Sequence, residues 1–96
     1  KAVETGTEMS EERLHKIKRL KMRSMRRGIK EMDIILSHFA SNCLEDMNLD
    51  QLSNYDLLTL ENDHDLYSWV TGTAKPPQKF SYLINEILDN LQALKD

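Results

Sequence analysis

Arg27 and Glu31 are the two side chains whose types and spacing most clearly suggest a function. They lie at the start of a long segment with helical apolar periodicity, and Gly28 directly follows the arginine. Residues four apart share one face of an α-helix, so these two charged side chains can meet there. The same face would carry Ile34 and His38, which places an apolar side chain among polar ones. The pattern predicts a surface that binds another protein; a solvated face with one stray isoleucine is the alternative.

Other residues that could perform chemistry do not form workable combinations. The three histidines lie far apart in the sequence, at His15, His38 and His64. The single cysteine, Cys43, cannot complete a zinc site, and it has no histidine within one helical turn to act as a base. No glycine-rich loop follows a strand, as a nucleotide diphosphate site would require. We therefore expect no catalytic residue, no metal site and no cofactor site on this chain.

Two short blocks of sequence resemble one known family. The first, Arg-Arg-Gly-x-x-Glu-x-Asp over residues 26–33, opens an apolar helix; the second, Asp-x-Asp-Leu-Tyr-x-Trp-Val, covers residues 63–70. Both are similar to motifs of the succinate dehydrogenase assembly factors. The second block departs from the family pattern at His64, where proline or tryptophan is common, and at Val70, where leucine is common. The similarity runs from about Leu20 to Gly72, more than half of the chain.

The resemblance implies a chaperone rather than an enzyme. Members of this family promote the covalent attachment of FAD to the flavoprotein subunit of succinate dehydrogenase, and the same role is expected toward its relative, fumarate reductase. FAD would be attached to the partner subunit, so the factor itself would need no cofactor. Carrying the first motif over, and adding the exposed helix face, gives six expected partner-binding residues: Arg26, Arg27, Gly28, Glu31, Ile34 and His38. Asp33 is expected to support the fold instead.

The charge distribution leaves a second function class open. The net charge is −3, yet residues 13–30 contain nine basic side chains and no acid, while residues 31–74 contain nine acids and no lysine or arginine. The basic segment could steer a partner into contact, or it could lie across the acidic helices of the same domain. It could also serve a small nucleic-acid-binding or regulatory protein. The low isoelectric point, about 5.6, and the acidic remainder argue against nucleic acid.

Apolar periodicity and capping residues predict five helices and no strand. The first would begin after Ser10 and the second would cover residues 29–43, with Met32, Ile35, Leu36, Phe39 and Cys43 on its buried side. Asn48 and Gln51 form the pattern of a capping box at the start of a third helix. A fourth would start at residue 62 or 63 and end at Gly72, and a fifth would follow the proline pair at 76–77.

These elements predict one all-α domain, a compact five-helix bundle over residues 10–96. A disordered segment is expected over residues 1–9, which show no periodicity. Ninety-six residues are enough for one modest core. No run approaches the roughly 20 apolar residues of a membrane span, so no membrane insertion is expected. We expect a free monomer in a bacterial cytoplasm, or in the mitochondrial matrix if the source is eukaryotic.

Overall fold

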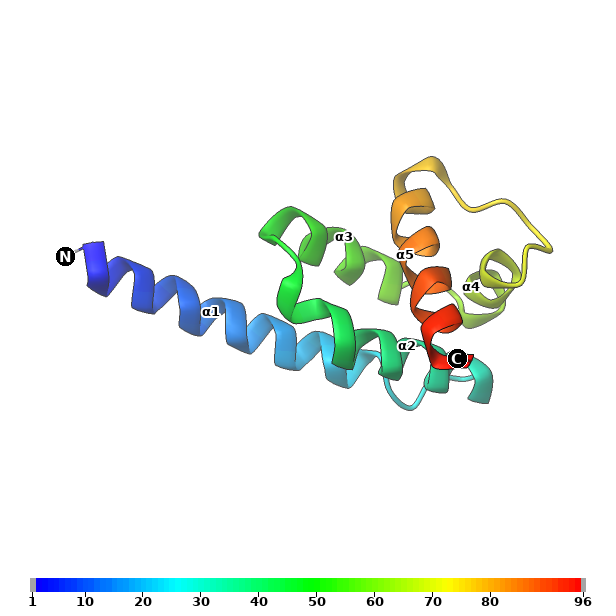
Figure 1. Cartoon of the computed structure of the whole chain (residues 1–96), viewed down its shortest axis with the longest axis horizontal. Coiled ribbons are helices and arrows are strands. Elements are labelled where there is room, and N and C mark those ends of the chain that lie inside the picture. The colour runs from blue at the N-terminus through cyan, green and yellow to red at the C-terminus, as the bar shows by residue number, and fades with distance from the viewer. Residues whose placement is uncertain (1, 96) are drawn as a thin grey trace.

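The computed structural model describes the backbone of residues 2–95 and the side chains of residues 12–93. Over this range the chain forms five α-helices and one short 3-10 helix, with no strand (Figure 1). The elements are α1 (Ala2–Arg23), α2 (Lys30–Cys43), η1 (Leu44–Asp46), α3 (Leu49–Thr59), α4 (Asp63–Val70) and α5 (Gln78–Lys95). The predicted all-α class and the order of the five helices are confirmed.

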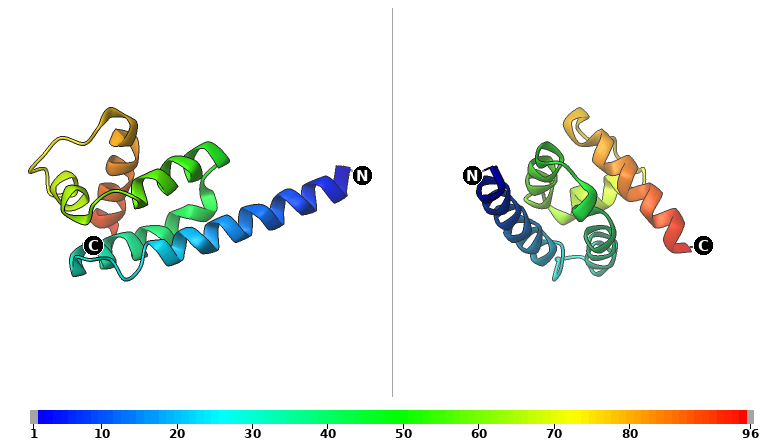
Figure 2. Two further views of the ribbon diagram at one scale, coloured as in Figure 1. Left: turned by 180° about the vertical axis from the view of Figure 1, so that it is seen from behind. Right: turned by 60° about the vertical axis from the view of Figure 1, so that its left-hand side comes forward.

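The first helix is the longest and projects from the rest. Helix α1 packs against both α2 and α3, but its N-terminal part extends past the start of α3 (Figures 1 and 2). The molecule therefore measures 50 × 26 × 25 Å. The helix begins at Ala2, whereas the sequence predicts a start after Ser10. No proline in this segment stops a helix from extending in the N-terminal direction.

One hydrophobic core lies where the five helices meet. Its largest fully buried side chains are Leu20, Met32, Leu36, Phe39, Leu44, Leu52, Tyr55, Leu58, Leu66, Phe80, Leu83 and Ile87. On α2, Met32, Leu36 and Phe39 are buried as predicted, whereas Ile35 and Cys43 are half-buried. On α1, Ile17 and Leu20 are buried, but Leu14 is 60% exposed, and Met25, beyond the end of the helix, is 51% exposed.

Local capping residues set the helix boundaries. The Asn48 side chain accepts a hydrogen bond from the Gln51 amide, and the Gln51 side chain accepts one from the Asn48 amide, which completes the predicted capping box. Asn62 caps α4 through a bond from the His64 amide. Gly72 adopts a φ of 80° just after α4, a conformation that glycine adopts without strain. In the described part of the chain, no helix is both long and apolar enough to cross a membrane.

Candidate functional site

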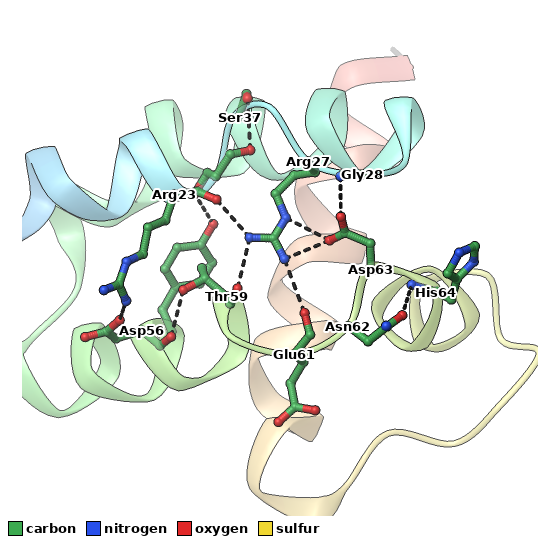
Figure 3. A network of polar contacts seen from close by, with 12 residues as sticks. Arg23, Arg27, Gly28, Ser37, Asp56, Thr59, Glu61, Asn62, Asp63 and His64 are labelled. Atoms are coloured by element: carbon green, nitrogen blue, oxygen red, sulfur yellow. Dashed lines mark hydrogen bonds and ion pairs between the residues drawn. The ribbon is translucent and has the colours of Figure 1, made fainter.

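Arg27 does not lie on a helix; it lies in the connection between α1 and α2, and its side chain points inward. Its Nε and Nη2 atoms lie 2.8 Å and 2.7 Å from Oδ1 of Asp63, at the start of α4 (Figure 3). Nη1 donates to the carbonyl oxygens of Arg23 and Thr59, each at 2.9 Å. Nη2 also donates to the carbonyl of Glu61 at 3.4 Å. The Arg27 side chain is only 10% exposed.

This arrangement joins the ends of three helices. The last carbonyl groups of a helix have no partner within the helix, and Arg23 and Thr59 are the final residues of α1 and α3. A guanidinium group offers five N–H donors in a fixed plane, so one arginine can satisfy both ends and still pair with a carboxylate. We call the contacts among Arg27, Gly28 and Asp63 the Arg27–Asp63 clamp.

Gly28 takes part in the clamp through its backbone. Its amide donates a hydrogen bond to Oδ2 of Asp63, the oxygen that Arg27 leaves free (Figure 3). A Cβ atom at position 28 would lie 3.1 Å from that oxygen, which is tighter than an ordinary contact. The structure thus gives an internal reason for this glycine: the carboxylate of Asp63 approaches the backbone so closely that a side chain here would force it to shift. The sequence suggested an external one, the approach of a partner.

The predicted pairing of Arg27 with Glu31 is wrong. Helix α2 begins at Lys30, and Ile29 before it is extended, so Arg27 and Glu31 do not lie one turn apart on a helix. An exposed pair of this kind contributes only about 0.2–0.5 kcal/mol. The largely buried ion pair with Asp63 and the hydrogen bonds to the two helix-end carbonyls contribute more to stability, so these contacts determine where Arg27 lies.

The rest of the predicted face does exist on α2. Glu31, Ile34 and His38 follow one another at intervals of three and four residues, and we call them the α2 ridge. Glu31 and Ile34 are exposed, Ile34 to 54%, and His38 is half-buried beside Asn42, whose Nδ2 atom lies 3.2 Å from the His38 ring. Arg26, also exposed, precedes the clamp with a φ of 55°. The ridge therefore adjoins the loop that the clamp fixes.

A buried hydroxyl pair lies behind the clamp. Ser24 Oγ is 2.6 Å from Tyr55 Oη and donates to the Leu20 carbonyl at 2.8 Å. Burial raises the pKa of Tyr55 to about 12, although the Ser24 hydrogen bond and the charge of Arg27 act in the opposite direction. The Ser37 hydroxyl, in turn, bonds to the Ser24 carbonyl and to the Asp33 carboxylate. The role expected for Asp33, support of the fold, agrees with this contact.

Most of the basic residues before α2 have partners inside the molecule. Arg19 and Arg23 both pair with Asp56 on α3, and Lys21 pairs with Glu45 at 3.5 Å. Arg13 donates to the Glu45 carbonyl, and Lys16 donates to the Ser53 hydroxyl. The sequence left open whether the basic segment steers a partner or lies across the acidic helices of its own domain. For these basic residues, the structure shows contacts within the domain.

Cys43 and possible metal ligands are the remaining groups that could perform chemistry. Cys43 is half-buried, and its pKa is raised, first by burial and then by the negative charges of Glu86 and Asp46. A raised pKa disfavours the thiolate, which is the nucleophilic form. Among the residues that the structure describes, no group of three His, Cys, Asp or Glu side chains could hold a metal ion.

Asp63 is the site residue whose role the sequence reasoning missed. Asn62 caps α4, which leaves the Asp63 carboxylate free to pair with Arg27. A signal was present: Arg27 and Asp63 belong to the two separate blocks that carry the family resemblance. The structure brings these two blocks into direct contact, which spacing along the sequence could not reveal.

Comparison with known proteins agrees with these motifs. The family model described as "Flavinator of succinate dehydrogenase" matches residues 18–95. Succinate dehydrogenase assembly factor 2-B, mitochondrial, of Drosophila mojavensis is 39% identical over 72 residues, 73% of this chain and 46% of that protein. Succinate dehydrogenase assembly factor 2, mitochondrial, of Penicillium rubens is 46% identical over 79 residues, which cover 82% of this chain and 25% of the Penicillium protein.

A third relative gives the same picture. Succinate dehydrogenase assembly factor 2, mitochondrial, of Saccharomyces cerevisiae is 38% identical over 79 residues, which cover 81% of this chain and 49% of the yeast protein. The chain thus spans between a quarter and about half of the length of these three curated relatives. The match of the family model to 78 of the 96 residues, 18 to 95, is decisive. The chain belongs to the family of succinate dehydrogenase flavinators.

Proposed function

We propose that this chain is an assembly factor that binds the flavoprotein subunit of succinate dehydrogenase and promotes the covalent attachment of FAD to that subunit. The observation that carries the proposal is the family match over residues 18–95. The relatives are named as assembly factors of the same enzyme. We extend the proposal to the flavoprotein subunit of fumarate reductase, the related enzyme expected from the sequence.

The α2 ridge, together with Gly28 and Arg26, is the surface that we assign to the partner. Ile34 supports this assignment because it is 54% exposed between two polar side chains and would lose that exposure in an interface. Arg27 acts differently. With 10% of its side chain exposed, it serves as a positioning residue that fixes the loop at Gly28 and the start of the ridge.

The mechanism that fits is conformational rather than catalytic. A binding protein favours one conformation of its partner to the extent that it binds that conformation more tightly. In that state, the partner's own residues and the flavin would be held in a reactive geometry, and positioning of this kind lowers reaction barriers substantially. The chemistry and the FAD would both belong to the partner subunit, and this chain would act as a non-enzymatic monomer.

The nucleic-acid alternative loses its main support in the structure. It rests on the basic segment, but Arg19, Arg23 and Arg27 pair with carboxylates of the same molecule. As for the compartment, the relatives are named as mitochondrial proteins. This supports the mitochondrial matrix over the bacterial cytoplasm, the other compartment expected from the sequence.

Charge reversal on the ridge tests the proposal. Glu31 is exposed on α2, so Glu31→Arg should change the free energy of unfolding by no more than about 0.5 kcal/mol. At an interface the same change would leave a charge unpaired and could cost several kcal/mol of binding. Asp89→Arg, at an exposed position on α5, is the matched control.

The readout is in-gel flavin fluorescence of the flavoprotein subunit in cells that lack the native factor. We expect full fluorescence with the wild type and with Asp89→Arg, and little with Glu31→Arg. Co-purification of the subunit should follow the same order. Normal fluorescence with a folded Glu31→Arg variant would exclude the α2 ridge from the function. Absence of fluorescence with the wild type itself would contradict the proposed function.

A further inference from the structure

Arg26 has a backbone conformation that its residue type does not favour. Its φ is 55°, in the left-handed region, where the Cβ atom of an L-residue crowds the following carbonyl oxygen. In the described part of the chain, the other residue with a positive φ is a glycine, Gly72 after α4. Glycine and asparagine adopt this conformation with less strain, so the fold alone would favour either of them over arginine at position 26.

Two anchors hold the backbone on either side of Arg26. Before it, the carbonyl oxygen of Ser24 accepts a hydrogen bond from the Ser37 hydroxyl of α2 at 3.2 Å. After it, the Arg27–Asp63 clamp fixes the next residue to the start of α4 (Figure 3). The chain crosses between these anchors in only three residues, so its path there is closely constrained. Strained residues held by their surroundings in this way are concentrated at binding and catalytic sites.

The Arg26 side chain does not explain the arginine through contacts within the molecule. It is exposed, and among the residues that the structure describes it takes part in no ion pair. The neighbouring arginines of the basic segment all bond to carboxylates or backbone carbonyls of the chain, at Arg13, Arg19, Arg23 and Arg27. Position 26 therefore combines an unfavourable backbone conformation with a guanidinium group that is free to bind another molecule.

We propose that Arg26 recognises a carboxylate of the flavoprotein subunit, and that its strained, doubly anchored backbone presents the guanidinium for that contact. The inference rests on the proposed function and names the chemistry of one contact within it. A guanidinium pairs with a carboxylate through two parallel N–H···O bonds, which demand a fixed orientation. A loop that is already fixed loses less conformational freedom on binding, so the contact gains affinity from the anchors.

A carboxylate fits this position better than a phosphate group of FAD. Phosphate sites in proteins combine several donors, typically the backbone amides of a helix start or a nest. In this loop the Gly28 amide already donates to Asp63, and the Arg27 guanidinium is bound to the same carboxylate. One free guanidinium remains in the loop, and it matches a single carboxylate of a protein partner.

Variants at position 26 separate the side chain from the backbone. Arg26→Ala and Arg26→Gly both lack the guanidinium, but only the alanine keeps the Cβ atom that causes strain. We expect the glycine variant to have the higher urea midpoint, and both to bind the purified flavoprotein subunit about ten- to hundredfold more weakly than the wild type. Arg26→Lys keeps the charge but not the planar fork, so its affinity should lie between. Lys18→Ala removes an exposed cation of α1 and should bind as the wild type does.

Affinities are measured with the subunit prepared with and without FAD, and the loss should be the same in both. Equal binding by the wild type and both truncated variants, with loss in Glu31→Arg, would overturn this inference and leave the proposed function standing. Full binding by Arg26→Gly with weak binding by Arg26→Ala would assign position 26 a purely structural role. A loss seen only with FAD present would assign Arg26 to a phosphate of the cofactor. Failure of the wild type to bind would contradict the proposed function, and this inference with it.

Discussion

Arg27 and Gly28 of the Arg27–Asp63 clamp lie next to the α2 ridge in the sequence, but the two regions differ in burial and in bonding. In the clamp, the Arg27 side chain is 10% exposed and makes contacts to Asp63 and to carbonyls of three other residues. On the ridge, Glu31 and Ile34 are exposed to solvent. Residues 27–38 therefore contain a buried, structural part and an exposed part.

The difference shows how one motif can serve two purposes. A contact buried in the clamp contributes to folding, because removing one partner leaves a charge or an amide without compensation. An exposed side chain contributes little to folding, so it is available for binding at small cost in stability. Variants of the two halves should accordingly separate loss of stability from loss of binding.

The largest effect on stability should come from the other side of the ridge helix. Phe39 is fully buried and lies 5.5 Å from Tyr55 between ring centroids, so Phe39→Ala should cost about 3–5 kcal/mol. Ile34→Ala, on the exposed side of the same helix, should cost less than about 0.5 kcal/mol. Urea denaturation measures both. An unchanged unfolding midpoint for Phe39→Ala would contradict the buried face of α2.

Breaking the clamp should come next. Asp63→Ala leaves Arg27 without its carboxylate and the Gly28 amide without its acceptor, so it should destabilise the chain by about 3 kcal/mol. Asp65→Ala, in the same turn of α4 but exposed, should cost less than about 1 kcal/mol, chiefly through the helix dipole. Equal costs for the two variants would mean that the clamp contributes nothing beyond that dipole.

Alkaline pH should weaken the interior behind the clamp. The folded pKa of Tyr55, about 12, lies above the ordinary value of 10.0. Between these values the unfolded chain loses the phenolic proton and the folded chain keeps it, so stability is complete below pH 10 and falls as pH rises toward 12. The loss should be on the order of 2 kcal/mol. As pH rises, the urea midpoint of Tyr55→Phe should fall less steeply than that of the wild type. Identical slopes for the two proteins would contradict the raised pKa of Tyr55.

Gly28 lies where the two halves meet, and its substitution should give the smallest stability effect of the four. Gly28→Ala places a Cβ 3.1 Å from Asp63 Oδ2 and should cost about 1 kcal/mol as the carboxylate shifts. Gly28→Arg should add a loss of flavin attachment, because bulk and charge then project at the ridge. Lys30→Ala is the exposed control. Unaltered stability of Gly28→Ala with lost flavin fluorescence would favour the partner-facing role that the sequence suggested.

Local patterns in the sequence predicted local structure well. The capping box at Asn48, the stop at Gly72 and the buried stripe of α2 all depend on residues within a few positions of one another, where propensity and periodicity act. The start of α1 was predicted at Ser10, a residue that suits an N-cap, but the helix begins at Ala2.

The candidate site was predicted only in part, for a physical reason. Glu31, Ile34 and His38 share a helix, so spacing alone places them together. Arg27 was assigned to the same face because Glu31 is the acid at helical spacing, but its true acid, Asp63, is 36 residues away. Long-range pairing of this kind leaves no periodic trace.

The distance in sequence between Arg27 and Asp63 also sets an order of events during synthesis. The contact closes a loop of 36 residues that contains all of α2 and α3, and closing such a loop costs chain entropy before any contact repays it. On the ribosome, the residues of the α2 ridge emerge well before Asp63. The nascent chain therefore presents Glu31 and Ile34 before the clamp can anchor the start of α2, and it gains a fixed surface only after α4 has emerged.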